Sequence, residues 1–187
     1  MLIIPNYALL IVDAQRQFEA ARCPVTLRAI CREVDIARRA NLPIVVLEFP
    51  PDDLLHAAVE LERHKGIITP PPRHDVLKPT TDRRVMDALA GYDKFCVRWK
   101  HQSDGSANVI YALWDHQWPS ENFRVVGVNT DKCVYKTIRN LREQFRPQAR
   151  IELVLDACNT TCDFDWGIFD DLNVEMIAGD NQSEKIA

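Results

Sequence analysis

Glycine is scarce in this sequence, which has 6 glycines in 187 residues and no G-x-G-x-x-G run. The first long apolar segment is followed by DAQRQF, and this turn has no glycine that would let a pyrophosphate approach the backbone. A dinucleotide-binding enzyme is therefore disfavoured.

Long basic runs and long apolar runs are also missing. The formal net charge is −4, which disfavours nucleic acid and anionic membranes as partners. No apolar run approaches the ~20 residues of a membrane span. The opening MLIIPNYALLIVDAQ has neither the basic start nor the small-residue cleavage site of a signal peptide. We therefore expect a cytoplasmic protein that does not contact a membrane.

Zinc-finger spacing is absent as well. In a cytosolic chain of this size, cysteines are expected to be free thiols. Two of them form a C-x3-C pair, but no second Cys or His pair at zinc-ligand spacing accompanies it, so a structural zinc site is disfavoured. The six cysteines are Cys23, Cys31, Cys96, Cys133, Cys158 and Cys162.

Apolar runs typical of buried strands alternate with helical patterns along the chain. The expected strands are 7–13, 43–49, 94–99, 123–128, 151–157 and 173–178, and the expected helices are 25–40, 82–89, 106–114 and 130–145. This alternation implies right-handed crossovers. We predict an α/β protein with three α/β/α layers around a mainly parallel, Rossmann-like sheet of about six strands, in a single domain over residues 1–187.

Three reactive side chains stand at or just past the ends of predicted strands: Asp13, Lys100 and Cys133. In a parallel sheet, ligands bind outside the carboxyl ends of the strands. A helix start and a nearby ammonium would both favour the Cys133 thiolate. Asp13 would accept the thiol proton, and the N–H groups at the helix start would bind an oxyanion.

Each of the three residues also has an ordinary structural interpretation. An aspartate at a strand end is often a turn residue, a lysine there is usually solvated, and a cysteine in a core helix is more often a small hydrophobe. Only their joint placement favours a catalytic site.

Three segments carry a resemblance to a known family. ALLIVDAQRQF and VVGVNTDKCV resemble the D-x-Q-x-x-F and G-V-x-T-x-x-C-V segments of isochorismatase-like cysteine hydrolases, which include nicotinamidases and N-carbamoylsarcosine amidases. VRWKHQSDGSANV is similar more loosely to the lysine segment, with Asn108 where phenylalanine is usual. The resemblance covers residues 7–157.

The resemblance implies a catalytic triad of Asp13, Lys100 and Cys133. Cys133 would attack a carbonyl-type carbon, Asp13 would act as general base and then acid, and Lys100 would orient and polarise. It also implies a cis peptide between Val128 and Asn129, with the N–H groups of Asn129 and Cys133 as the oxyanion hole. A homodimer or larger homo-oligomer is expected by the same similarity.

The family's branches differ in ways that bear on the substrate. Members that hydrolyse isochorismate need no cysteine nucleophile, so Cys133 argues against that substrate. Nicotinamidases carry a D-x-H…H metal set after the second strand. Here Asp52, Asp53, His56 and His64 have a different spacing, and the two histidines are about two helical turns apart. We therefore expect no metal and no cofactor.

Substrate contacts are less well indicated. Phe18, Trp99, His101 and Gln102 flank the strand ends and are weaker candidates, since each is more often packing or surface. The favoured function is hydrolysis of a small amide-type C–N bond through an acyl-thioester on Cys133. The alternative is a non-catalytic member of the fold that serves as a binding or assembly module.

Overall fold

A six-stranded parallel sheet forms the centre of the protein, whose computed structural model describes residues 6–50, 79–145 and 149–179. The strand order is β3-β2-β1-β4-β5-β6, and every neighbouring pair is parallel. The strands are β1 (Ala8–Val12), β2 (Ile44–Glu48), β3 (Phe95–Trp99), β4 (Phe123–Val128), β5 (Ile151–Asn159) and β6 (Glu175–Ile177). The predicted fold class is confirmed.

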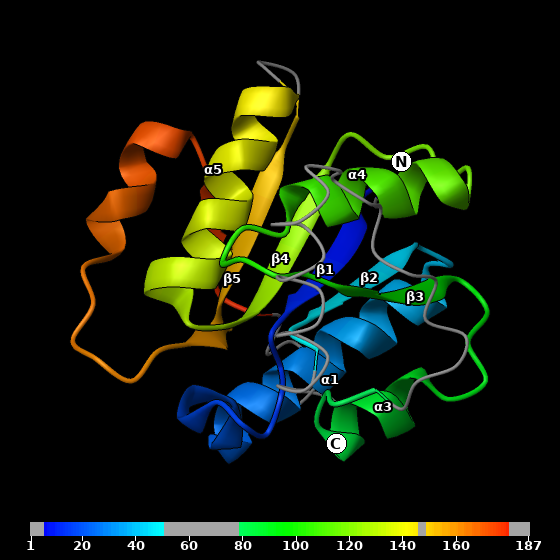
Figure 1. Cartoon of the computed structure of the whole chain (residues 1–187), viewed down its shortest axis with the longest axis horizontal. Coiled ribbons are helices and arrows are strands. Elements are labelled where there is room, and N and C mark those ends of the chain that lie inside the picture. The colour runs from blue at the N-terminus through cyan, green and yellow to red at the C-terminus, as the bar shows by residue number, and fades with distance from the viewer. Residues whose placement is uncertain (1–5, 51–78, 146–148, 180–187) are drawn as a thin grey trace, which may run out of the picture.

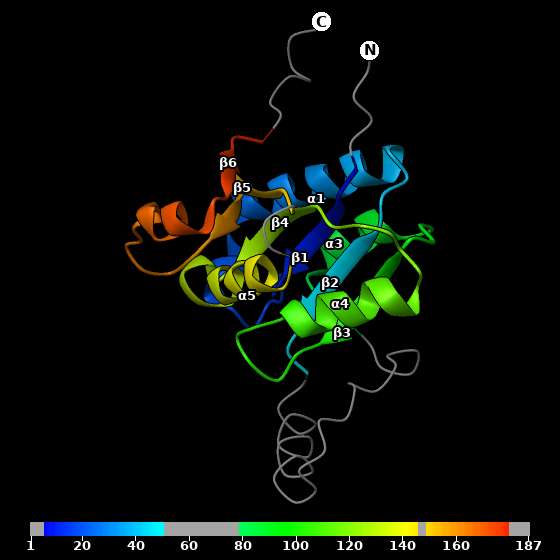
Figure 2. The ribbon, with the colours of Figure 1, turned by 90° about the horizontal axis from the view of Figure 1, so that it is seen from above.

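Helices cover both faces of this sheet (Figures 1 and 2). The helices α1 (Pro24–Arg39) and α3 (Arg83–Leu89) pack on one face, and α4 (Ser106–Asp115) and α5 (Tyr135–Gln144) pack on the other. Short 3-10 segments, η1 (Glu19–Arg22) and η3 (Trp166–Leu172), and a π-type turn, η2 (Thr130–Val134), complete the described elements.

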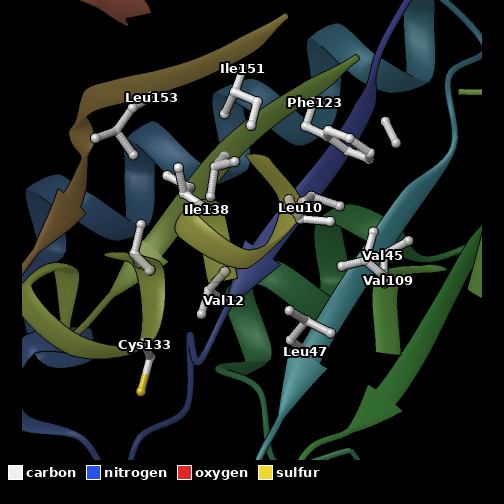
Figure 3. Packing of buried hydrophobic residues seen from close by; sticks show 14 of the residues in the cluster. Leu10, Val12, Val45, Leu47, Val109, Phe123, Cys133, Ile138, Ile151 and Leu153 are labelled. Atoms are coloured by element: carbon white, nitrogen blue, oxygen red, sulfur yellow. The ribbon is translucent and has the colours of Figure 1, made fainter. Parts of the chain in front are cut away.

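Strand alternation builds the two cores. Leu10 and Val12 of β1 point to the α4/α5 face, whereas Leu9 and Ile11 point to the α1/α3 face, and all four are fully buried. Figure 3 shows the first of these cores, with Cys133 at one end and its sulfur pointing away from the other side chains. The core therefore ends where the chemistry is expected.

One helix face differs from the prediction. The sequence pattern of 106–114 places Trp114 on the inward face with Val109 and Leu113, but Trp114 is 75% exposed. The helix is instead turned so that Ala112 is buried beside Val109 and Leu113.

Close approach of two strands also fixes a glycine beside the predicted site. Gly127 of β4 has φ +139°, and a Cβ on it would lie 2.1 Å from the Val12 carbonyl oxygen of β1. No other residue fits there. The register between β4 and β5 shifts at the same place, between Val125 and Gly127.

Candidate active site

A buried ion pair links the ends of β1 and β3. The Lys100 Nζ atom lies 2.9 Å from the Asp13 Oδ2 atom, and both side chains are fully buried. Lys100 Nζ also donates to the Gln102 carbonyl oxygen at 3.1 Å. Lys100 follows β3 and Asp13 follows β1, and β2 lies between these two strands in the sheet. The Lys100 side chain therefore reaches across the end of β2 to meet Asp13.

The Lys100 main chain is held on both sides. Its N–H donates to the Glu48 carbonyl oxygen at 2.7 Å, which extends the β2–β3 pairing by one bond. The Asn108 side-chain amide donates to the carbonyl oxygen of Trp99 at 2.6 Å. Asn108 thus fastens the end of β3 to the first turn of α4.

Gly105 lets α4 begin against the lysine stem. A Cβ on Gly105 would lie 2.5 Å from the Leu47 Cδ1 atom and 3.2 Å from the Lys100 Cδ atom. Its N–H donates to the Thr137 Oγ1 atom of α5 at 3.0 Å. The loop after Lys100 is therefore packed tightly between β2 and α5.

Cys133 lies in the π-type turn that follows β4 and is 5% exposed. Asn129 before it has a left-handed backbone, with φ 56° and ψ 55°. The Asn129 carbonyl oxygen accepts from Lys132 at 2.9 Å, from Cys133 at 2.8 Å and from Val134 at 3.3 Å. Such π turns are frequent at functional sites.

Asp13, Lys100 and Cys133 interact with one another in this arrangement. The Asp13 carboxylate and the Lys100 ammonium both act on the pKa of the Cys133 thiol, and neither Asp13 oxygen has a hydrogen-bond partner among the described residues apart from its ion pair with Lys100. Asp13 has φ +52°, a backbone conformation that is uncommon for residues other than glycine. The structure thus brings together the three side chains that the sequence places at strand ends.

The ionisation of Cys133 differs from the sequence expectation of a favoured thiolate. Burial, and then the Asp13 carboxylate, raise the pKa of the thiol to about 12, and the Lys100 ammonium offsets only part of that rise. Burial likewise raises the pKa of Asp13, while Lys100 and the thiol act in the opposite direction. The Cys133 thiol is therefore protonated at neutral pH, and its proton has to be removed before the sulfur can attack.

The oxyanion hole and the cis Val128–Asn129 bond stay predictions. The Cys133 N–H already donates to the Asn129 carbonyl oxygen at 2.8 Å, so an oxyanion would have to share that donor. The Asn129 residue itself is partly exposed beside the site.

Two further buried polar side chains hold the loops around the site, and sequence reasoning gave them no functional role. Gln15 is fully buried, and its amide accepts from the Phe49 N–H and donates to the Phe49 carbonyl oxygen, both at 2.8 Å. Glu48, also fully buried, accepts from the Thr81 N–H at 2.8 Å. Glu48 ends a buried strand, as Asp13 ends the first predicted strand. A polar residue at a strand end was therefore the feature of the sequence that could have indicated a role for Glu48.

The weaker substrate candidates are placed as follows. The Phe18 ring meets the Phe49 ring edge-on, with centroids 5.9 Å apart. Gln102 contributes its carbonyl oxygen to Lys100, and Trp99 is buried. The His101 Nδ1 atom is buried without a hydrogen-bond partner among the described residues. Of the four, Phe18 stands beside an aromatic ring that itself contacts Lys100.

The metal question falls largely outside the described residues. Asp52, Asp53, His56 and His64 lie in the part of the chain that the structure does not describe. Within 6–50, 79–145 and 149–179, no group of three or more His, Cys, Asp or Glu side chains is placed to hold a metal ion. Within the same ranges, no helix is both long and apolar enough to cross a membrane.

Sequence comparison identifies one domain family. A family model described as the isochorismatase domain matches residues 7–160. No curated protein matches the sequence.

Several solved structures share the fold. The MAR1 ribonuclease from Caenorhabditis elegans aligns with a TM-score of 0.68 at 19% identity, over 95% of this chain and 79% of that one. The N-carbamoylsarcosine amidase from Thermoplasma acidophilum gives 0.64 at 20% identity, over 94% and 98%. A pyrazinamidase/nicotinamidase from Streptococcus mutans gives 0.66 at 15% identity, over 91% and 99%. At such identities these likenesses show the fold.

Proposed function

This chain belongs to the isochorismatase family, and on that premise we propose that it is a cysteine hydrolase that cleaves a small amide-type C–N bond. The observation that carries the proposal is the buried Asp13–Lys100 ion pair, 2.9 Å apart, which acts electrostatically on the Cys133 thiol. A base, a cation and a nucleophile at one sheet edge are the groups that acyl transfer requires.

The first half-reaction forms an acyl-enzyme. The thiol proton passes from Cys133 Sγ to the Asp13 carboxylate as the sulfur attacks the amide carbonyl carbon. The oxyanion formed on the carbonyl oxygen collapses, the C–N bond breaks, and Asp13 gives its proton to the departing nitrogen. The products of this step are ammonia or an amine and a thioester on Cys133.

The second half-reaction restores the enzyme. Asp13, again ionised, takes a proton from water as the water oxygen attacks the thioester carbon. The C–S bond then breaks, and the sulfur regains its proton from Asp13. The carboxylic acid leaves, so that one water is consumed for each amide cleaved.

Charge conservation explains why a thiol with a raised pKa suits this role. Before transfer the negative charge opposite Lys100 lies on Asp13, and after transfer it lies on the sulfur. The buried site therefore keeps the same net charge, and no additional charge has to be desolvated. Burial raises the pKa of Asp13, which makes its carboxylate a stronger base than an exposed one.

Ammonia release tests the proposal. A panel of small carboxamides should contain at least one that the protein hydrolyses, and Cys133→Ala should abolish that activity. Cys162→Ala is the matched control, because Cys162 is exposed and should leave the rate unchanged. Turnover by Cys133→Ala would reject the mechanism.

The alternative, a non-catalytic binding module, predicts a different result for the same proteins. A module would bind a member of the panel, detected by a concentration-dependent rise in melting temperature, without releasing ammonia from it. The buried Asp13–Lys100 ion pair favours the enzyme, because such a pair is costly to maintain and a binding surface does not require one.

We also propose that the chain acts as a single domain in the cytoplasm, as a homodimer or larger assembly. The six cysteines are all free thiols, which suits a reducing compartment. Light scattering coupled to size-exclusion chromatography would measure the assembly, and a monomer at micromolar concentration would contradict that part.

A further inference from the structure

We propose that Phe49 is a positioning residue for Lys100, whose ammonium it holds against Asp13 with the face of its ring. Its consequence for catalysis rests on the proposed function, whereas the contact itself does not. Phe49 follows β2, so the proposal adds the end of this strand to the site.

The contact is short and shielded from water. The Lys100 Nζ atom lies 3.7 Å from the centre of the Phe49 ring. The Lys100 side chain has no exposed surface, and its Nζ atom also meets the Asp13 carboxylate and the Gln102 carbonyl oxygen. A cation over an aromatic face is attracted by the ring quadrupole, and the attraction is stronger when the cation is desolvated.

The ring is held in place by its own main chain. Gln15 binds both the N–H and the carbonyl oxygen of Phe49, each at 2.8 Å, and its Nε2 atom also donates to Thr80 Oγ1 at 2.5 Å. Phe18 packs edge-on against the Phe49 ring at 5.9 Å. Gln15 lies only two residues after Asp13, so one clamp fixes the carboxylate segment and the ring together.

The expected consequence is electrostatic. The ammonium lowers the pKa of Asp13 against the effect of burial. The charged or titratable groups that act on Asp13 are Lys100 after β3, Cys133 after β4 and Glu48 at the end of β2. If the ring is removed and the ammonium moves away, Asp13 loses part of this stabilisation and its pKa rises.

The rate at which iodoacetamide alkylates Cys133 reports the change in the Asp13 pKa without a substrate. The reaction needs Asp13 to accept the thiol proton, so its rate should rise with pH as Asp13 ionises. Phe49→Leu keeps an apolar side chain of similar bulk but removes the ring face. For the loss of a desolvated cation–π contact, we expect the rise of the alkylation rate with pH to shift to a higher pH by about half a unit or more. At any pH below this rise, the variant should be alkylated at least about threefold more slowly than the wild type.

Three further variants separate this role from simple packing. Phe49→Tyr keeps the ring face and should restore the wild-type profile. Gln15→Met should shift it in the same direction as Phe49→Leu, because the ring loses its clamp. Tyr111→Leu, an exposed aromatic position on α4, should change nothing. Peptide mapping assigns the label to Cys133, and urea midpoints show whether each variant is folded.

The outcomes are distinct. A profile that Phe49→Leu leaves unmoved, or that Phe49→Tyr fails to restore, would overturn the positioning role. If Phe49→Leu does not fold, Gln15→Met and Phe49→Tyr decide the question by the same profile. Absence of ammonia release from every carboxamide would count against the proposed function alone, because alkylation is read without turnover.

Discussion

Replacing Lys100 with methionine tests the buried ion pair through stability. Lys100→Met keeps an unbranched apolar stem of similar length but leaves the Asp13 carboxylate buried without its cation. Removing one partner of a buried pair costs about 3–5 kcal/mol, because the remaining charge is uncompensated. That is a large share of the roughly 5–15 kcal/mol by which a typical domain is stable.

The direction of the Asp13 pKa shift determines how this loss of stability changes with pH. The folded pKa of Asp13 is raised above the ordinary 3.8 by burial, and Lys100 restrains the rise. Stability from a raised carboxyl is fully present below pH 3.8 and is lost as pH rises through the folded pKa, by up to about 1.4 kcal/mol per pH unit. Without Lys100 the folded pKa is higher, so the loss continues to a higher pH.

Urea unfolding of both proteins from pH 5 to pH 8 measures the difference. Lys100→Met should be destabilised less at the low end of this range than at the high end. Lys136→Met, at an exposed position of α5, is the matched control and should lose little at any pH. In the double variant Asp13→Asn/Lys100→Met, which lacks the carboxyl group, the pH dependence that Lys100→Met adds to the free energy of unfolding should disappear. Equal destabilisation by Lys100→Met at every pH would refute the pairing.

Two other predictions use packing and capping near the site. Gly105→Ala places a methyl group 2.5 Å from Leu47 Cδ1 and 3.2 Å from Lys100 Cδ. It should cost about 1–3 kcal/mol in urea unfolding and slow Cys133 alkylation, and an unchanged rate would contradict the tight packing. Asp82 caps α3 at Arg84 N, and its bonds to Arg84 and Arg16 lower its pKa to about 2. Its stabilisation is present above pH 3.8 and lost as pH falls toward 2. In urea unfolding, Asp82→Ala should therefore lower the free energy of unfolding by about 1 kcal/mol at pH 7 and by little at pH 2. An equal loss at both pH values would contradict the capping role.

The sheet and the meeting of Asp13, Lys100 and Cys133 could be anticipated because they depend on short-range signals. Buried strands such as β1 and β4 are continuous apolar runs, and a parallel sheet gathers their carboxyl ends at one edge. Polar residues that follow such runs therefore converge, even when about 90 residues separate them. The family resemblance then implied which of the three residues is the base, which is the orienting cation and which is the nucleophile.

Other features depend on which side chains meet across the fold. Phe49 is the last residue of the predicted strand 43–49, and nothing in the sequence indicates that its ring meets Lys100, as it does where Gln15 holds its main chain. The helix start and the lysine suggested a thiolate, but burial and the Asp13 charge raise the pKa of the thiol by more than the lysine lowers it. Trp114 follows the helical period, yet the sheet selects Ala112 instead.

The most direct test of Cys133 as the nucleophile is the mass of the protein during turnover. An acid-quenched reaction with a hydrolysed carboxamide should show the protein heavier by the acyl group, with the added mass mapped to the peptide that contains Cys133. Cys133→Ala should show neither the added mass nor ammonia release. An acyl group on another residue, or hydrolysis by Cys133→Ala at the wild-type rate, would contradict the thioester mechanism.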